Sequence, residues 1–129
     1  LLATEWKAYN LPANPIAAVV ALSGVFDVAP LINTSMNADL RLTPDTAAPL
    51  NLMNTRVMSS ARLILATGAD EPAEFHAQSA GLARAWSALK PEVLQLPATN
   101  HYSIVDSLAE PSGQLHRRVC AIAGQGTTG

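Results

Sequence analysis

The sequence contains almost none of the residues that build disulfides, metal sites or polyanion-binding surfaces. Its 129 residues include one cysteine, Cys120, and eight basic residues against ten acidic ones, which gives a net charge of -2. A single cysteine cannot form an intramolecular disulfide, and His116, one helical turn before it, does not complete a metal site. We therefore interpret Cys120 as a helix packing residue and expect no metal and no other cofactor. Because lysine and arginine form no cluster, nucleic acid and membrane surfaces are not expected partners.

Long apolar runs and targeting signals are also missing. The most apolar run, residues 16–22, has about a third of the length that crosses a bilayer. Residues 1–10 contain no initiating methionine, no basic n-region and no secretory cleavage site. We therefore expect a cytoplasmic protein, and we expect the given sequence to begin inside a helix. The lone cysteine fits the same reducing compartment.

The residues that are present suffice for one hydrophobic core, since 49% are hydrophobic and only 14% are charged. Three short apolar segments predict strands, at residues 16–22, 62–67 and 92–96. The first is a continuous apolar run with β-branched members between Pro15 and Gly24. That pattern is typical of a strand buried on both faces of a parallel sheet.

Helical segments alternate with these strands. Between Ala73 and Leu89 apolar residues recur at helical spacing, which predicts an amphipathic helix covering the sheet. Residues 1–10 predict the end of an earlier helix, residues 112–123 a final helix, and residues 124–129 a disordered tail. The order of the elements indicates an α/β fold with a doubly wound, mostly parallel sheet.

The residues between the first two strands, 26–60, are irregular and rich in proline. Thr43, with Pro44 at the first helical position, predicts the cap of a short helix. We expect this segment to form a lid or cap over the sheet edge. Its apolar side chains either line an acyl or aryl pocket or simply pack, and the candidates are Leu31, Ile32, Met36, Leu40 and Leu42.

Acidic and imidazole side chains follow two of the predicted strands, where ligands bind in a parallel sheet. Asp70 and Glu71 come after the second strand, and His101 comes after the third. This order reproduces the last two members of the sequence serine, acid, histidine that α/β-hydrolases use. The carboxylate would accept the Nδ1 proton of the imidazole, so that Nε2 can take a proton from a nucleophile.

Four segments of the sequence resemble the kynurenine formamidase (arylformamidase) group of esterases. They are LSGVFD at residues 22–27, LRLT at 40–43, GADEPAEF at 68–75 with Gln78 and Ser79 after it, and NHYSIV at 100–105. The resemblance runs from about Leu1 to about Leu115, and it implies the C-terminal half of an α/β-hydrolase in residues 1–123. It also implies that residues 1–6 follow the nucleophile elbow. The serine, and with it the oxyanion hole, would then lie upstream of Leu1.

The same resemblance assigns roles to the acid and the histidine. His101 would be the general base and then the general acid of the triad. With the Glu74-Phe75 pair aligned, the family's acid falls on Glu71, whereas aspartate is the commoner residue type, so Asp70 stays an alternative. A third acid, Asp27, is expected to fix its loop as a hydrogen-bond acceptor.

The remaining serines and histidines are interpreted as structural residues. Ser79 lies in AQSAG, which imitates G-x-S-x-G, but a nucleophile elbow needs a strand before the serine and a helix after it. Ser23 is expected to hydrogen-bond the backbone, and Ser103 to lie in the first turn of a helix. His76 and His116 are expected to be solvated helix residues.

These features predict a serine hydrolase that acts on a small ester or an aryl formamide through an acyl-enzyme, and the resemblance implies N-formylkynurenine as the substrate. A general carboxylesterase of the same fold is one alternative. The other is a noncatalytic fragment that lacks the nucleophile. The expected partners are a small-molecule ester or amide, and either a second copy of the chain or the N-terminal half, paired through an uncovered strand edge.

Overall fold

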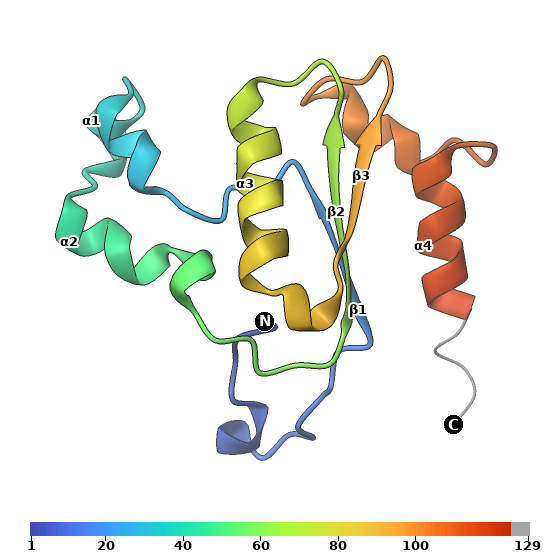
Figure 1. Ribbon diagram of the computed structural model, residues 1–129, viewed down its shortest axis with the longest axis horizontal. Coiled ribbons are helices and arrows are strands. Elements are labelled where there is room, and N and C mark those ends of the chain that lie inside the picture. Colours follow the sequence, from blue (N-terminus) through green and yellow to red (C-terminus); the bar gives the residue numbers. More distant parts are fainter. Residues whose placement is uncertain (125–129) are drawn as a thin grey trace.

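The computed structural model describes residues 1–124, and a three-stranded parallel sheet lies at its centre (Figure 1). The strands are β1 (Ala18–Leu22), β2 (Arg62–Gly68) and β3 (Glu92–Leu96), in that order across the sheet. The predicted bounds of β3 are confirmed, β2 is one residue longer than predicted, and β1 starts two residues later. The predicted parallel α/β architecture is therefore present.

Alternation along the central strand β2 gives the molecule two hydrophobic clusters. Leu63 and Leu65 point to the face covered by α3 (Ala73–Ala85), while Ile64 and Ala66 point to the face covered by α4 (Gln114–Gly124). Helix α3 is followed by η5 (Ser87–Leu89), so the amphipathic pattern over residues 73–89 is confirmed. The two helices lie on opposite sides of the sheet, as in a doubly wound fold (Figure 1).

The expectation that the first strand is buried on both faces is wrong. Every residue of β1 is only half-buried, whereas β2 is buried from Leu63 to Gly68. Among residues 1–124, β1 and β3 each pair with β2 alone, so both are edge strands, and β1 is the less buried of the two. The apolar run was correctly taken as a strand, but its own sequence does not show how many neighbours it has.

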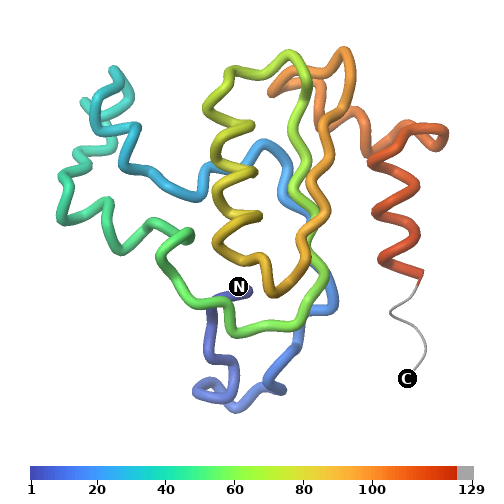
Figure 2. The backbone as a smooth tube through the Cα atoms, in the orientation of Figure 1, coloured from blue at the N-terminus to red at the C-terminus, as the bar shows by residue number. Residues whose placement is uncertain are grey.

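Residues 26–60 leave the sheet after β1, run beside α3 and return to β2 (Figure 2). They contain five short helices, which are η2 (Ala29–Asn33), α1 (Asn37–Leu40), α2 (Pro44–Ala47), η3 (Ala48–Leu50) and η4 (Leu52–Asn54). The predicted cap at Thr43 is confirmed, since its side chain accepts a hydrogen bond from the Thr46 backbone N–H. We call residues 27–51 the excursion, because the Leu52 N–H donates to the Phe26 carbonyl at 2.8 Å and closes its two ends.

Helix α3 holds the residues after the excursion at two further points. A Cβ on Gly81 would lie 2.6 Å from Cε of Met53, so a glycine allows η4 to lie directly against the helix. At the end of α3 the buried Trp86 donates its indole N–H to the Thr55 carbonyl at 2.9 Å. Residues 53–55 are therefore attached to the second half of α3 and to its C-terminal end. That residues 26–60 act as a lid stays a prediction.

The ends of the described chain differ from expectation in small ways. Residues 1–10 form one turn of 3-10 helix, η1 (Trp6–Tyr9), which Asn10 ends in the left-handed conformation. Gly124 is the last residue of α4, so the predicted disordered tail is wrong at that position, and residues 125–129 lie outside the described residues. Cys120 is exposed on α4, which contradicts its interpretation as a packing residue.

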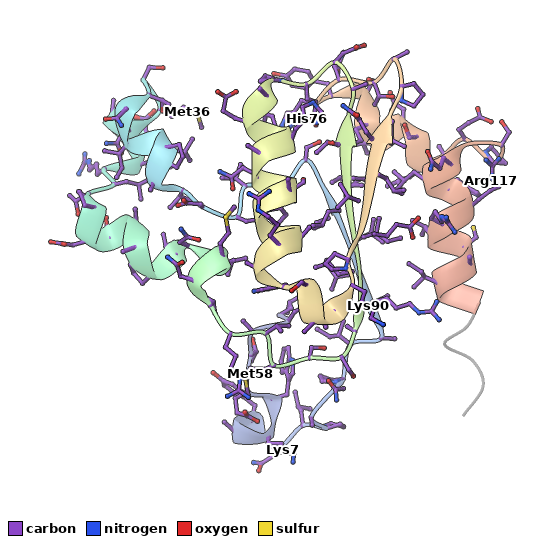
Figure 3. All side chains as sticks on the ribbon, viewed as in Figure 1. Lys7, Met36, Met58, His76, Lys90 and Arg117 are labelled. Atoms are coloured by element: carbon purple, nitrogen blue, oxygen red, sulfur yellow. The ribbon has the colours of Figure 1, made fainter. Side chains whose placement is uncertain are left out.

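Some basic side chains lie apart, as Figure 3 shows for Lys7, Lys90 and Arg117, whereas Arg62, Lys90 and Arg118 line a common hollow. Within residues 1–124, no helix combines the length and apolar character that crossing a bilayer requires.

Candidate active site

The loops that follow β2 and β3 are joined backbone to backbone at the carboxyl edge of the sheet. The Ala69 N–H donates to the Leu96 carbonyl at 2.8 Å, and the Asp70 N–H donates to the Thr99 carbonyl at 3.0 Å. A Cβ on Gly68 would lie 2.1 Å from the Thr99 carbonyl oxygen. Only glycine permits this close approach, which brings the acidic loop and the histidine loop together.

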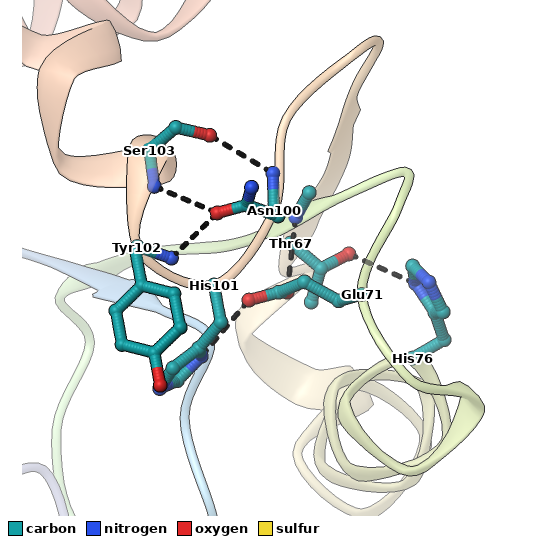
Figure 4. Close-up of polar contacts among 8 residues, drawn as sticks. Thr67, Glu71, His76, Asn100, His101, Tyr102 and Ser103 are labelled. Atoms are coloured by element: carbon teal, nitrogen blue, oxygen red, sulfur yellow. Dashed lines mark hydrogen bonds and ion pairs between the residues drawn. The ribbon is translucent and has the colours of Figure 1, made fainter.

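The side chains of Glu71 and His101 meet across these two loops (Figure 4). Glu71 Oε1 lies 3.0 Å from Nδ1 of His101, and Glu71 Oε2 accepts the backbone N–H of Gly68 at 3.0 Å. Both carboxylate oxygens thus have a partner although the side chain is completely buried. A buried carboxylate is tolerated when it is hydrogen-bonded in this way, and it favours an imidazole that carries its proton on Nδ1.

Asp70, the alternative acid, lies one residue away but faces solvent. Among the described residues its carboxylate makes no hydrogen bond, and its backbone N–H serves the loop contact with Thr99. The structure therefore brings together His101 and Glu71, and it does not bring Asp70 into contact with the imidazole.

A turn centred on Asn100 sets the position of the histidine. Its side-chain oxygen accepts the backbone N–H groups of Tyr102 at 2.9 Å and of Ser103 at 3.0 Å. In return, the Ser103 hydroxyl accepts the Asn100 N–H at 3.0 Å. This reciprocal capping starts η6 (Ser103–Leu108), so the placement of Ser103 in a first helical turn is confirmed. Asn100 caps the helix, which leaves the side chain of His101 free to reach Glu71.

Aromatic rings limit the motion of the imidazole. Phe75, in the first turn of α3, stacks on His101 with ring centroids 4.5 Å apart and an interplanar angle of 29°. Tyr102 meets the same imidazole edge-on at 5.7 Å. The sequence pattern had assigned Phe75 to the core-facing stripe of the helix. Its position in the first turn of α3, next to the loop that follows β2, is the feature that could have indicated this contact.

The other candidate residues have structural surroundings. Asp27 accepts the Ala29 N–H at 3.0 Å, which confirms its loop-fixing role. Ser79 is 2% exposed within α3 and is not preceded by a strand, so it has no elbow geometry. Ser23 is also buried, but its hydroxyl has no hydrogen-bond partner among residues 1–124, contrary to the expected backbone bond.

His76 and His116 are less solvated than expected. Nδ1 of His76 lies 3.1 Å from the hydroxyl of Thr67, which is buried in β2. Nδ1 of His116 lies 2.6 Å from the Leu108 carbonyl, so it joins α4 to η6. Both side chains are half-buried because their helices pack on the sheet or on a neighbouring helix, and a single helix pattern does not predict such partners.

Two hollows lie at the start of α3. The first, about 390 Å³, is lined by His101, and the second, about 400 Å³, lies between α3 and the start of the excursion. Pro72 and Phe75 line both, so the hollows are neighbours. Within residues 1–124, no group of three or more histidine, cysteine or acidic side chains could hold a metal ion.

Comparisons with known proteins identify relatives of this chain. No family model matches the sequence. The kynurenine formamidases of Salmo salar and Danio rerio are each 25% identical over 97% of this chain and 45% of their own length. The crystal structure of a protein from Silicibacter sp. TM1040, proposed to be a thioesterase, superposes with a TM-score of 0.73 and 25% identity over 88% of this chain and 43% of that one.

The chain has an α/β-hydrolase fold. It is similar to the kynurenine formamidases, and it spans less than half the length of the curated relatives it matches. In an α/β-hydrolase the parallel strands end at one edge of the sheet, which explains why loops 30 residues apart in sequence carry side chains in contact.

Proposed function

We propose that the protein containing this chain is a serine hydrolase of small esters or aryl formamides, in which Glu71 and His101 are the acid and the histidine of the triad. The observation that carries the proposal is the contact of the buried Glu71 carboxylate with Nδ1 of the partly exposed His101 imidazole. The order of these residues along the chain, acid after one strand and histidine after the next, supports it.

The proposed chemistry follows from the contact of Glu71 with Nδ1 of the His101 imidazole. Glu71 accepts the Nδ1 proton, so Nε2 is left as the base that removes the proton of a serine hydroxyl as the oxygen attacks the substrate carbonyl. The imidazolium formed is stabilised by the carboxylate and returns the proton to the leaving alcohol or amine. Water then repeats the cycle on the acyl-enzyme and releases the acid. Phe75, stacked on the ring, keeps the imidazole oriented through both steps.

We propose that the nucleophile comes from a segment outside the 129 residues. Within residues 1–124 no serine, threonine or cysteine side chain is hydrogen-bonded to His101. The hydroxyl that does contact an imidazole, that of Thr67 beside His76, is 2% exposed and out of reach of a substrate. A segment that pairs with the free edge of β1 would arrive at the same end of the sheet as His101.

The substrate class is proposed from the relatives and from the hollows. The curated relatives are kynurenine formamidases and the structural neighbour is a proposed thioesterase, so the chemistry they share is hydrolysis at an acyl carbonyl. The hollow beside Phe75 is lined mostly by apolar groups, which suits a small substrate with an apolar part. N-formylkynurenine and simple carboxylic esters both meet that description.

The decisive experiment compares His101→Ala with His116→Ala in the full-length natural protein. We expect His101→Ala to lower kcat/KM for p-nitrophenyl acetate and N-formylkynurenine by about 10³-fold or more, because the base is removed. The His116→Ala control, which removes an imidazole that contacts a helix carbonyl, should keep most of the activity. Equal activity of the two variants would refute the proposed role of His101.

A further inference from the structure

The hollow between α3 and the start of the excursion is mostly apolar. Phe75 lines it and separates it from the imidazole of His101. The volume of the hollow is about 400 Å³, which is enough for an aromatic ring or a short acyl chain. One wall is the start of α3, with Pro72 and Phe75, and the other is the loop after β1, with Val25, Pro30 and Leu31. Phe75 also stacks on His101, so a group held in the hollow lies next to the proposed catalytic base.

One side chain fastens the second wall to the first. Gln78 Oε1 accepts the backbone N–H groups of Phe26 at 2.9 Å and of Asp27 at 2.8 Å, and its Nε2 donates to the Asp27 carbonyl at 2.8 Å. These three hydrogen bonds join residues more than 50 positions apart in sequence. We call this set of contacts the Gln78 clamp.

On the side that faces the hollow, the loop after β1 is held by the hydrogen bonds of Gln78. Its backbone N–H groups at Phe26 and Asp27 are donors that a strand end leaves without ladder partners, and Gln78 satisfies both with one oxygen. Phe26 itself is buried and its ring packs over Gly24, where a Cβ would lie 2.3 Å from it. The loop is thus fixed by the core on one side and by Gln78 on the other.

Helix α3 connects the clamp to the proposed catalytic pair. Gln78 lies one helical turn after Phe75 and both line the same hollow. A shift of the 25–31 wall changes the shape of the hollow, while Glu71, His101 and the contacts between their loops stay as they are. The geometry therefore separates the group that shapes the hollow from the groups that perform the proposed chemistry.

We infer that Gln78 is a positioning residue that holds open a binding site for the apolar part of the substrate, an aryl ring or an acyl chain, between Phe75 and Leu31. The expected kinetic effect of Gln78 rests on the proposed hydrolase function. The binding site itself does not, because it binds an aromatic amide whether or not the protein hydrolyses that amide.

The kinetic test uses the full-length natural protein with Gln78→Met, Gln78→Glu and Gln95→Met. Methionine keeps the length of glutamine and removes all three hydrogen bonds, whereas glutamate can still accept from the two N–H donors but cannot donate to the Asp27 carbonyl. Gln95 is exposed on β3, and its side chain makes no hydrogen bond among the described residues, so Gln95→Met is the matched control. Three esters separate the contributions, with ethyl acetate as the small reference, phenyl acetate for the aryl ring and ethyl octanoate for the acyl chain.

We expect Gln78→Met to lower kcat/KM about tenfold for phenyl acetate, ethyl octanoate or both, mainly through KM, and to change ethyl acetate less than about twofold. Gln78→Glu should fall between Gln78→Met and the wild type, and Gln95→Met should match the wild type. The substrate that loses most identifies which apolar group occupies the hollow. An equal loss for all three esters, or no loss for any, would overturn the inference.

A binding test separates this inference from the proposed function and from loss of folding. Acetanilide is titrated into isotope-labelled wild-type protein, and amide shifts are followed by NMR. We expect shifts concentrated at Leu31, Phe75 and the Gln78 side-chain amide, even if no ester is hydrolysed. Shifts confined to other surfaces, or none, would refute the binding site while leaving the roles of Glu71 and His101 to their own test.

Discussion

The carboxylate of Glu71 is completely buried, whereas the imidazole of His101 that it contacts is 46% exposed. In the proposed mechanism, the carboxylate that orients the imidazole is thus enclosed, and the ring that would exchange protons with a substrate stays reachable. The backbone N–H of Gly68 on the second carboxylate oxygen fixes the direction of the carboxylate toward Nδ1. The buried Glu71 is therefore expected to matter more for activity than the exposed acid beside it.

Replacing the buried acid should reduce activity far more than replacing its exposed neighbour. In the full-length protein we expect Glu71→Gln to lower kcat by about 10³–10⁴-fold, because the amide no longer selects the imidazole with its proton on Nδ1. Asp70→Asn should lower it less than about threefold, since that carboxylate contacts no imidazole. Steady-state hydrolysis of p-nitrophenyl acetate measures both. A larger loss of kcat for Asp70→Asn than for Glu71→Gln would show that Asp70 is the acid of the triad.

The contact between the two loops predicts a stability effect at one glycine. Gly68→Ala would place a Cβ 2.1 Å from the Thr99 carbonyl oxygen, a backbone atom that cannot turn aside as a side chain can. We expect the free energy of unfolding to fall by about 1–3 kcal/mol, as measured by urea denaturation of the full-length protein. Gly124→Ala is the control, because a Cβ there would meet no atom of residues 1–124 within 4 Å. Similar stabilities of the two variants would show that the loops are not in contact as described.

The free edge of β1 predicts self-association of the isolated 129-residue chain. Among residues 1–124, β1 pairs on one side only, and its five apolar residues are each half-exposed. Such an edge presents unpaired backbone groups to a second strand. We propose that the isolated chain dimerises or aggregates through β1, and that Val20→Lys reduces this. Light scattering measures the effect, and Val105→Lys, at an exposed position of η6 outside both strand edges, is the matched control. A monodisperse monomer at high concentration would contradict the prediction.

A surface turn predicts a pH effect with a defined sign. The Ser112 hydroxyl donates to the Glu110 carboxylate at 2.5 Å, and this bond, together with that from the Ser112 N–H, holds the pKa of Glu110 below its ordinary value of 4.5. Because the folded pKa is the lower one, the stabilisation is present above pH 4.5 and is lost as the pH falls through the folded pKa. Ser112→Ala should raise the pKa of Glu110 in an NMR titration of its carboxyl carbon, whereas Ser107→Ala should leave it unchanged.

Local patterns were sufficient to predict the elements of the fold. The strand at residues 92–96 and the amphipathic helix over residues 73–89 were placed correctly because their periodicity and their bounding prolines act within a few residues. The exposure of β1 and of Cys120 was not predicted, because each depends on which neighbouring element is present. A sequence pattern reports the preference of a segment, and burial is decided by the rest of the molecule.

The candidate site shows the same limit at finer scale. The sequence located an acid and a histidine after successive strands, but it left two adjacent acids in competition. Which acid contacts the imidazole depends on which side chain the turn after β2 directs inward. Here the backbone N–H of Gly68 donates to the Glu71 carboxylate and closes that turn. Gln78 belongs to the resemblance, but its contacts were not predicted because its partners lie more than 50 residues away in sequence.

The single hydrogen bond from the Leu52 N–H to the Phe26 carbonyl, which closes the excursion, has a consequence for how such a protein can diversify. Residues 27–51 leave and re-enter the framework at one point, so insertions, deletions or a grafted loop between those ends need not displace β2, β3 or the residues after them. Loop-closure entropy grows slowly with length, so such changes cost little stability. We expect a directed-evolution library confined to the excursion to change which molecules are accepted while the contact between Glu71 and His101 keeps its geometry.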